Sequence, residues 1–470
     1  MKKFYCENMK IRDELGREVI FKGANHCYKG NSISQFKKFM MKPSTLDTYK
    51  ELGINLVRLG ITWNFLEPFE GEYNDELIDL LKEFCDNCKN RGIYVYLDLH
   101  QDLYSPYFYG DGAPNWAVNP KYNGQKFAFV WAEGYFYMND VQNAFADFWN
   151  DENLVQTKFI KMWQHLTCKL SSCDNIIAYD YLNEPYVHEN GRKIFLSLLE
   201  KAMKKIFNAQ LNLGEYFSLY EEKRAFKRII LKIITILKTP FGVKKLLNAL
   251  DDKETFAHIV DGLDEYTNEF NEKYYEKFYN RIKSEVNEKG LFNMFEHNYY
   301  SNLGIPFEIN TTDNDIYSPH AYDFFVDTPL YNKYASNNRI SVIIDAIRQN
   351  QLKMNVPVIF GEWGGSGKKG DTRHLDFVVS QFEKYHWSNT YWGDIENSPN
   401  IKKFMMRPAP IAVCGDIDEI RTDVEKREFH LKWTQNKEFP QNIKTEVFVP
   451  NEGIRYIDSK MGKNEITIKY

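Results

Sequence analysis

Short apolar runs alternate with helix-spaced apolar residues along most of the chain. The runs are bounded by turn residues, which is typical of buried strands, and they lie at Val19–Ala24, Ile54–Ile61, Ile93–Leu99, Ile176–Leu182, Leu291–Glu296, Ile316–Asp323, Val356–Gly365 and Ser388–Gly393. Between them, Asp75–Arg91 and Asn139–Leu170 have the spacing of helices. Alternation of strand, helix and strand is the signature of a parallel sheet that is covered on both faces.

The number of predicted strands makes an α/β fold of the TIM-barrel type the leading expectation. Lys10–Asn25 predicts a hairpin that turns at Asp13–Gly16 and leads into the first barrel strand. After Arg407 the pattern changes, because three segments alternate apolar and polar residues: Phe429–Trp433, Thr445–Val449 and Glu465–Tyr470. We therefore expect a barrel domain of residues 1–400 and a small β domain of residues 401–470.

Two glutamates end predicted strands. The run Ile176–Leu182 is followed by Asn183 and Glu184, and Pro185 stops the strand. The seventh run ends at Glu362 and breaks into glycines. In a barrel these two strand ends face each other across one mouth, and retaining glycoside hydrolysis needs such a pair, roughly 5–5.5 Å apart, as acid/base and nucleophile. Asn183 then binds the sugar 2-hydroxyl. The alternative for Glu184 alone is a solvated side chain at a strand end.

Other polar and aromatic residues also lie near the ends of predicted strands. Arg58 is placed to hold Glu362 ionised, Tyr322 to orient it, and Glu184 must keep a raised pKa to arrive protonated. Trp392 offers a flat apolar face for a sugar ring, and His100 and Asp102 offer hydrogen bonds to hydroxyls. Taken singly, a Trp or a His is more often a core residue and an Arg more often solvated. Their joint occurrence at successive strand ends favours a site.

Composition excludes several other functions. The chain has 470 residues, of which 43% are hydrophobic and 16% aromatic, and its net charge of −5 argues against general nucleic-acid binding. Its seven cysteines are odd in number and sparse, which fits reduced thiols. Cys85 and Cys88 form a C-x-x-C without a second pair, so no metal site is predicted. Met1–Lys10 lacks a signal-like apolar run, and we expect a cytosolic protein.

The motifs at these strand ends resemble glycoside hydrolase family 5. Asn183-Glu184-Pro185 with Glu362 and Trp392 is similar to the family as a whole, and further segments are similar to its endoglycoceramidase and glucosylceramidase branch: Leu99–Asp102, Gly110–Ala117, Ser318–Asp323 and Arg407–Gly415. The resemblance implies Glu184 as acid/base and Glu362 as nucleophile. It also implies a small β-sandwich as second module, no metal or organic cofactor, and a substrate-binding set of Lys29, His100, Asp102, Asn183, His320, Tyr322 and Trp392.

A long helical insertion at about residues 191–289, after the fourth strand, departs from the family pattern. Within it, residues 223–250 carry eight Lys and Arg and no acid, interleaved with Ile and Leu. A basic amphipathic helix that lies peripherally on an anionic membrane fits this pattern. The alternative, which the pattern favours slightly, is a solvated basic face on a helix packed against the barrel.

Taken together, these observations predict a retaining β-glycosidase that cleaves sugar from a lipid aglycone, most simply a glycosylceramide. A soluble β-glucosidase or oligosaccharide-cleaving enzyme is the alternative within the same class. A catalytically inactive carbohydrate- or lipid-binding barrel is the alternative from another class, and the presence of both glutamates argues against it. Which sugar is bound, and whether cutting is exo or endo, depends on loop shape.

Overall fold

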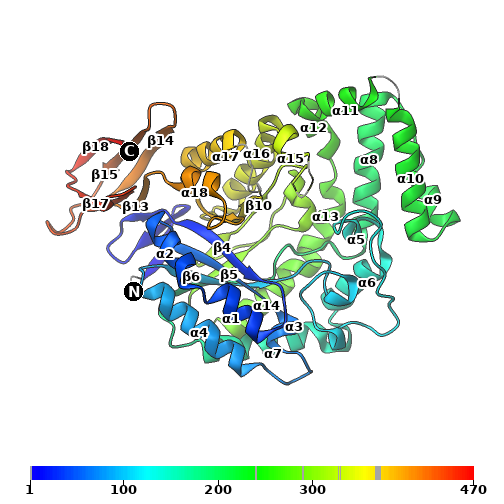
Figure 1. The fold of residues 1–470 in the computed structure, drawn as a ribbon, viewed down its shortest axis with the longest axis horizontal. Coiled ribbons are helices and arrows are strands. Elements are labelled where there is room, and N and C mark those ends of the chain that lie inside the picture. Colours follow the sequence, from blue (N-terminus) through cyan, green and yellow to red (C-terminus); the bar gives the residue numbers. More distant parts are fainter. Residues whose placement is uncertain (1–2, 239–240, 288–289, 327, 329, 366–371) are drawn as a thin grey trace.

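The computed structural model describes residues 3–238, 241–287, 290–326, 328, 330–365 and 372–470. At its centre is a parallel sheet with the strand order β10-β11-β12-β4-β5-β6-β7-β8-β9 (Figure 1). The strands are β4 (Lys22–Tyr28), β5 (Leu56–Thr62), β6 (Tyr94–His100), β7 (Ile176–Asp180), β8 (Phe292–Phe295), β9 (Asp315–Tyr317), β10 (His320–Ala321), β11 (Ile359–Gly364) and β12 (Ser388–Trp392). Their residues are almost all buried, as in sheets covered on both faces.

The sheet closes on itself. β9 pairs with β8 and β10 pairs with β11, so these two short strands are halves of one barrel strand. A parallel bridge from Tyr317 to Val358 joins the two ends of the strand order. The predicted TIM-barrel fold is confirmed.

Helices cover the outside of the barrel (Figure 1). They include α1 (Ile33–Met40), α2 (Pro43–Glu51), α4 (Asp75–Lys89), α7 (Val155–Lys169), α16 (Asn337–Met354), α17 (Thr372–Tyr385) and α18 (Pro399–Met405). In α4 the predicted apolar face is buried, and the Asn74 side chain caps the helix by accepting a hydrogen bond from the Leu77 amide. The 3.6-residue period therefore located this helix to within two residues of its end.

Two predicted elements differ from the structure. The run Val19–Ala24 is not one strand, since Val19 belongs to β3 (Glu18–Val19) and the barrel strand begins at Lys22. The predicted helix Asn139–Leu170 is two helices, α6 (Asn139–Trp149) and α7. The break lies at residues 151–154, where Asp151, Asn153 and Leu154 have positive φ. Asp and Asn tolerate this left-handed conformation better than most residues, which allows a sharp turn that helical periodicity does not reveal.

The C-terminal strands form an antiparallel β module together with the N-terminus. One sheet has the order β1-β2-β3-β13-β16-β17 and the other β14-β15-β18. The strands are β1 (Phe4–Glu7), β2 (Lys10–Asp13), β13 (Ala409–Val413), β14 (Asp416–Asp423), β15 (Glu428–Gln435), β16 (Thr445–Val449), β17 (Gly453–Ile457) and β18 (Gly462–Lys469). Both sheets contribute to one core, which contains Val413, Val447, Leu431 and Trp433. The division of the chain at residue 400 stays a prediction.

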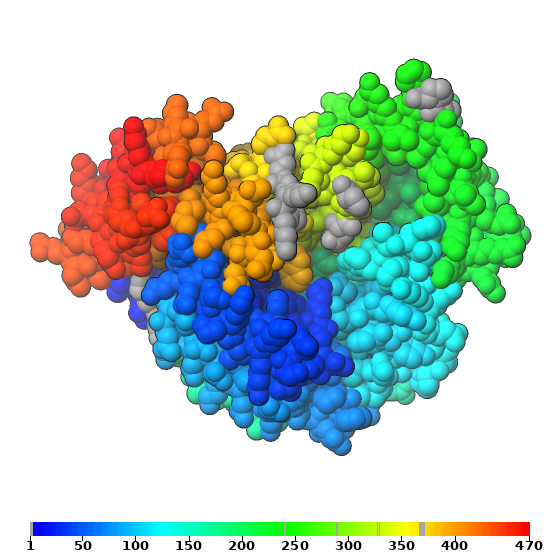
Figure 2. Space-filling model, viewed as in Figure 1, coloured from blue at the N-terminus to red at the C-terminus, as the bar shows by residue number. Residues whose placement is uncertain are grey.

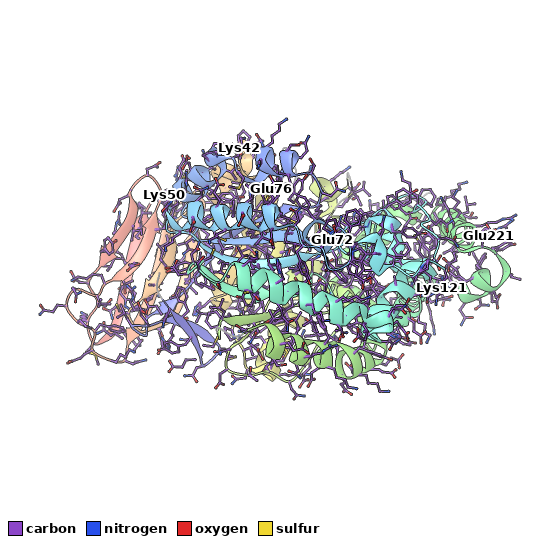
Figure 3. The ribbon with its side chains drawn as sticks, turned by 90° about the horizontal axis from the view of Figure 1, so that it is seen from below. Lys42, Lys50, Glu72, Glu76, Lys121 and Glu221 are labelled. Atoms are coloured by element: carbon purple, nitrogen blue, oxygen red, sulfur yellow. The ribbon has the colours of Figure 1, made fainter. Side chains whose placement is uncertain are left out.

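The insertion between β7 and β8 is mainly helical. It contains α8 (Gly191–Phe207), α9 (Gly214–Leu219), α10 (Glu222–Leu237), α11 (Gly242–Asp251), α12 (Lys253–Val260), α13 (Asp264–Phe270) and α14 (Glu276–Val286). The insertion forms an arm at the end of the molecule opposite the C-terminal strands (Figure 2), and Figure 3 shows Glu221 at that same end. Thr239, Pro240, Glu288 and Lys289 lie outside the described residues. Within the described ranges, no helix is both long and apolar enough to cross a membrane.

Candidate active site

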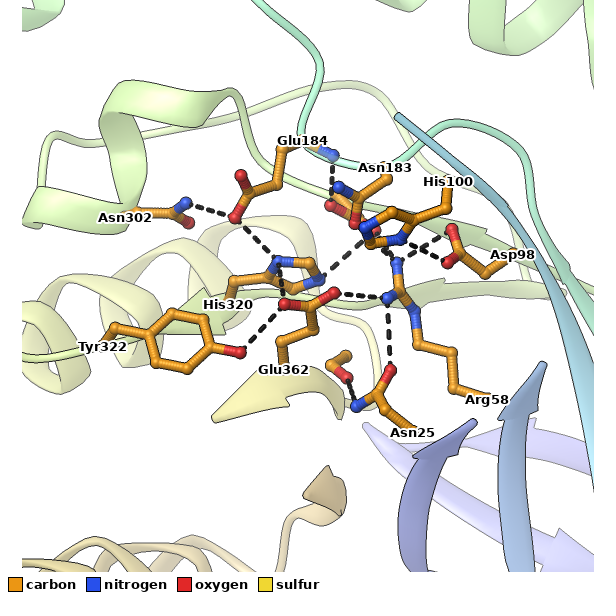
Figure 4. A network of polar contacts seen from close by, with 12 residues as sticks. Asn25, Arg58, Asp98, His100, Asn183, Glu184, Asn302, His320, Tyr322 and Glu362 are labelled. Carbon is orange, nitrogen blue, oxygen red and sulfur yellow. Dashed lines mark hydrogen bonds and ion pairs between the residues drawn. The ribbon is translucent and has the colours of Figure 1, made fainter. Parts of the chain in front are cut away.

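The carboxyl ends of the barrel strands bring the predicted residues into one polar network (Figure 4). β5 supplies Arg58, β10 supplies His320, and β11 supplies Glu362, while Asn183 and Glu184 follow β7. All parallel strands of a barrel end on one face, so residues that are far apart in sequence meet there. Lys29, Asp102, Tyr322 and Trp392 lie at the same strand ends.

Glu184 and Glu362 lie close together at the centre of this network. One carboxylate oxygen of each lies within 4.8 Å of the other and of a ring nitrogen of His320. Both residues are largely buried, with 8% of Glu184 and 6% of Glu362 exposed. The oxygen–oxygen separation is well below the roughly 6.5–9.5 Å that inverting glycosidases need between carboxyl groups to admit a water. The arrangement matches a retaining pair.

Glu184 is held in an unusual backbone conformation. Its φ is +43°, in the left-handed region, which is strained for a residue other than glycine. Its backbone N–H donates to Glu296 Oε2 at 2.7 Å, and Asn302 donates to its side-chain Oε1 at 2.8 Å. His320 Nδ1 lies 3.0 Å from the same oxygen. Burial raises the pKa of Glu184, and the hydrogen bond from His320 opposes only part of that rise.

Glu362 accepts two hydrogen bonds that fix its orientation. Arg58 Nη1 donates to Oε1 at 2.6 Å, and the Tyr322 hydroxyl donates to Oε2 at 2.9 Å. A charge-assisted bond from a guanidinium is stronger and more directional than a neutral one. Both Glu362 oxygens are therefore positioned by groups that the sequence pattern had placed at the mouth.

Arg58 is the central cation of the polar network. It is fully buried and contacts four carboxylates, those of Asp98 at 3.0 Å, Asp180 at 3.2 Å, Glu296 at 2.7 Å and Glu362 at 2.6 Å. Burial by itself would lower the pKa of Arg58, but these carboxylates raise it well above its ordinary value. The same guanidinium donates to the side-chain oxygens of two amides, Asn25 and Asn183.

Glu296 and His320 complete the charge balance. His320 Nε2 lies 3.3 Å from Glu296 Oε1. Burial would raise the pKa of Glu296, but His320 and Arg58 outweigh it and lower that pKa to about 2. Burial would lower the pKa of His320, yet Glu296 and Glu362 raise it well above its ordinary value. His320, which we expected to bind substrate, is fully buried and contacts the glutamates instead.

A second group of residues forms the predicted sugar subsite beside the glutamates. The His100 ring stacks on Trp392, with centroids 5.4 Å apart, and Lys29 Nζ lies 5.1 Å from a Trp392 ring centroid. Lys29 also forms an ion pair with Asp102, and it lies 3.7 Å from Asp111. Burial and the charge of Asp102 raise the pKa of Asp111 to about 7. An aromatic face rimmed by charged hydrogen-bonding groups is suited to a sugar ring with its hydroxyls.

The described part of the chain contains four groups whose ligand atoms lie close enough for a cation. Two of them are carboxylate clusters at the catalytic centre, Glu184–His320–Glu362 and Asp98–Asp180–Glu296, and the other two are Cys27–Asp98–His100 and His100–Asp102–Asp111. The positive charge of Arg58 already lies against the second cluster, and the His320 ring lies within the first. Arg58 and His320 thus offset part of the negative charge of these two clusters.

Several residues of the network were not predicted. Glu296 directly follows β8, so the strand-end rule that found Glu184 and Glu362 would have found it as well. Asp98 lies inside β6 and Asp180 is the last residue of β7, and both are buried. A buried acid within an apolar run is itself a signal that a buried cation is near. Asn302 lies in the short 3-10 helix η6 (Tyr299–Leu303) after β8, where no pattern in the sequence distinguishes it.

Comparison with known proteins agrees with this geometry. The family described as Cellulase (glycosyl hydrolase family 5) matches residues 13–398, and the family described as Glycoside hydrolase family 5 C-terminal domain matches residues 407–464. An endoglycoceramidase of Cyanea nozakii is 26% identical over 207 residues, which are 38% of this chain and 41% of that protein. A glucosylceramidase of Rhizopus delemar is 23% identical over 235 residues, 37% of this chain and 34% of that protein. The chain thus spans only about two fifths of the length of the first curated relatives that it matches.

Among solved structures, endo-glycoceramidase II from Rhodococcus sp. shares the fold. Its complex with ganglioside GM3 has a TM-score of 0.67 and 19% identity, and the match covers 98% of this chain and 99% of that one. Its lactosyl-enzyme intermediate has a TM-score of 0.66 and 19% identity, with 97% and 98% covered. The predicted family resemblance is confirmed by the family match, which extends over well more than half of the residues: this chain belongs to glycosyl hydrolase family 5.

Proposed function

We propose that the protein is a retaining β-glycosidase that releases sugar from a lipid aglycone of the glycosylceramide type. The retaining glycosidase activity is supported by the pair Glu184 and Glu362, whose carboxylate oxygens lie within 4.8 Å of each other at the barrel mouth. The lipid aglycone is supported by the names of the matched relatives and by the apolar surface of the mouth.

In the first step, Glu362 attacks the anomeric carbon while Glu184 gives its proton to the glycosidic oxygen, so the lipid alcohol leaves and a glycosyl ester forms. The raised pKa of Glu184 supports this role, because the proton must be present when the substrate binds. In the second step, Glu184 takes a proton from water, which attacks the anomeric carbon and frees Glu362. Arg58 and Tyr322 hold the nucleophile in the attacking orientation throughout.

The sugar lies, in this proposal, on Trp392. Lys29, His100 and Asp102 bind its hydroxyls, and Asn183 binds the 2-hydroxyl next to the reacting carbon. Two hydrogen bonds hold the Asn183 side chain in position for this contact. Its oxygen accepts from Arg58 at 2.9 Å, and its amide donates to the Gln101 carbonyl at 3.0 Å. One amide hydrogen remains for the substrate.

Apolar side chains near the mouth favour a lipid over a second sugar as the leaving group. Phe324 follows Tyr322 by two positions and is 55% exposed, and Leu330 in the same loop is 45% exposed. Exposed apolar residues next to a catalytic site are typical of surfaces that bind apolar ligands. A site for soluble oligosaccharides would need polar partners there.

The test compares leaving groups. Purified enzyme is given glucosylceramide, lactosylceramide and a ganglioside in neutral detergent, and in parallel an aryl β-glucoside and a soluble β-glucan oligosaccharide, and the released sugars are identified. The proposal predicts the highest kcat/KM on one of the glycolipids. A preference for the oligosaccharide would make the protein a soluble glycosidase, and binding without release of sugar would make it an inactive barrel. Glu362→Gln serves as the blank for every substrate.

A further inference from the structure

The helical insertion carries a concentration of uncompensated positive charge. Residues 223–250 hold eight basic side chains and no acid, in a chain whose net charge is −5. None of the eight forms an ion pair with a carboxylate of the described chain; the residues are Lys223, Arg224, Lys227, Arg228, Lys232, Lys238, Lys244 and Lys245. Some basic residues elsewhere, such as Lys42 and Lys169, are paired with acids. The charge of the insertion is therefore available to a partner.

The exposed face of α10 combines this charge with apolar side chains. Arg224, Lys227, Leu231, Ile234 and Lys238 follow one another at spacings of three or four residues, which places them on one side of the helix. Leu231 is 61% exposed and Ile234 is 40% exposed, in the middle of the stripe, and basic residues lie at both ends. An apolar centre with flanking Lys and Arg is the pattern of a helix that lies in a lipid interface.

The apolar surface continues past the end of α10. Phe241 is 75% exposed and Val243 is 54% exposed, and Lys244 and Lys245 come directly after them. The opposite face of α10 is packed, because Ala225, Phe226 and Ile229 are buried against the rest of the protein. The helix is thus packed on one side, and on the other side Lys227, Leu231, Ile234 and Lys238 are exposed.

α10 is also attached to the connection between β6 and β7, which carries Asp102 and Asp111 earlier in its sequence. Lys223 Nζ donates to the carbonyl of Lys126 at 3.1 Å, and the rings of Phe226 and Phe129 lie 6.4 Å apart. Residues 126 and 129 belong to the connection that follows β6, and Asp102 and Asp111 of the sugar subsite lie earlier in it. The insertion itself leaves the barrel just after Glu184. The insertion is therefore attached to the same β6–β7 connection that supplies Asp102 and Asp111.

We propose that α10 and the start of α11 dock on the surface of an anionic lipid bilayer and so hold the mouth at the membrane that contains the substrate. This inference rests on the proposed function, since a glycolipid is presented in a bilayer whereas a soluble glycoside is not. Exposed apolar residues within the basic stripe favour a bilayer over a nucleic acid, because lipid can bury Leu231 and Ile234 whereas a phosphate backbone cannot. Cations attract anionic headgroups, and the apolar side chains enter the interface.

The test variant is Lys227→Gln, Lys238→Gln and Lys244→Gln combined, because these three side chains are exposed and make no hydrogen bond, ion pair or ring contact with another described residue. The matched control is Lys50→Gln, Lys82→Gln and Lys161→Gln, which removes equal charge from α2, α4 and α7. Figure 3 shows Lys50 far from the insertion. Leu231→Ser with Ile234→Ser tests the apolar part of the face.

Flotation with vesicles of phosphatidylcholine, with and without phosphatidylglycerol, measures docking. The proposal predicts binding that requires the anionic lipid and weakens as salt rises. Each basic residue near an anionic surface contributes about fivefold, so the triple insertion variant should bind roughly 100-fold more weakly. The Leu231 and Ile234 variant should bind roughly tenfold more weakly, and the control variant should bind like the wild type.

Activity separates docking from catalysis. Wild type and insertion variants should hydrolyse an aryl β-glucoside equally, and the insertion variants should lose activity only on glucosylceramide embedded in anionic vesicles. Wild-type protein that hydrolyses glycolipid in detergent but ignores anionic vesicles at low salt would overturn the docking proposal and leave the proposed function intact. Equal binding by insertion and control variants would also overturn it. The proposal would also be overturned if the insertion variants lost self-association, measured by light scattering, but kept their vesicle binding. The exposed face of α10 would then join two copies of the chain.

Discussion

The catalytic mouth and the helical insertion both contain many charged side chains, but those at the centre of the mouth are buried and paired whereas many of those on the insertion are exposed. At the mouth, Arg58 is fully buried and contacts four carboxylates. On the insertion, Lys227 and Lys238 are exposed and have no carboxylate partner in the described chain. Buried charges must be compensated within the protein, and the compensation fixes their positions. Exposed charges need no internal partner, so they stay available to something outside.

This difference in burial suits the mouth to catalysis and the insertion to recognition. Catalysis requires groups held in a defined geometry, and the interlocked bonds of Arg58, His320 and the glutamates supply it. Docking on a bilayer requires a net charge and an apolar surface but no fixed geometry. Substitutions should therefore have large effects on rate and stability at the mouth and small effects on both at the insertion.

The largest effect is expected at the nucleophile. Glu362→Gln replaces the attacking carboxylate by an amide, which cannot form the glycosyl ester, so kcat should fall by roughly 10⁴-fold or more. Steady-state kinetics on an aryl β-glucoside measures it. Glu83→Gln, on the exposed face of α4, is the control and should leave kcat unchanged.

The acid should show an effect that depends on the leaving group. Glu184→Ala should lower kcat/KM by roughly 10²–10⁴-fold on substrates whose leaving group needs a proton, such as an alkyl glucoside. Aryl glucosides with strongly acidic phenols should be largely spared in the first step. A comparison of the two substrate types decides the matter, and equal losses on both would exclude Glu184 as the acid.

Replacing the buried Arg58 should destabilise the barrel. Arg58→Met leaves the carboxylates of Asp98, Asp180 and Glu296 buried without their cation, which should lower the free energy of unfolding by about 3–5 kcal/mol. Denaturant titration measures it. Arg421→Met removes an arginine that is about half exposed in the β module, and should cost less than about 1 kcal/mol. Similar losses for both variants would break the contrast between buried and exposed charge.

The pH profile should shift when His320 is changed. Activity requires protonated Glu184, so it falls as pH rises through the pKa of Glu184. The His320 ring, 3.0 Å from Glu184, favours the ionised carboxylate and so holds that pKa down against burial. His320→Gln should therefore move the basic limb of kcat/KM to higher pH, by roughly one unit or more. A limb that stays in place or moves to lower pH would show that His320 does not tune the acid.

The smallest effect is expected on the insertion. The combined Lys227→Gln, Lys238→Gln and Lys244→Gln change should alter the free energy of unfolding by less than about 0.5 kcal/mol, because these exposed side chains have no partner among the described residues to lose. The same denaturant titration measures it. A loss as large as that of Arg58→Met would mean that the basic face is structural.

The sequence predicted the barrel and much of its mouth because strand ends carry a readable signal. An apolar run that stops at an acid or an amide marks both the strand and the rim, and this signal predicts Glu184 and Glu362. Arg58 instead lies inside β5, as its third residue, and its side chain nevertheless reaches Glu362. Glu296 follows the same rule and was overlooked. His320 was placed in the substrate site, whereas its contacts are with the glutamates.

Other features depend on contacts that no local pattern contains. The run Val19–Ala24 is continuous in apolar character but is divided between two sheets, because Val19 pairs with Ala412, almost four hundred residues away. The turn at Asp151–Leu154 depends on backbone conformation rather than periodicity. On α10 the amphipathic pattern was visible, but the lack of ion pairs emerged only from where the carboxylates of the folded chain lie.

The most direct test of the proposed chemistry is to trap the covalent intermediate. A 2-deoxy-2-fluoro β-glucoside with a good leaving group slows the second step more than it prevents the first, so a glycosyl-enzyme should accumulate, and peptide mass mapping should locate it. The account predicts a stoichiometric label on Glu362 and none in Glu362→Gln. A label on any other residue, or products of inverted anomeric configuration from the natural substrate, would contradict it.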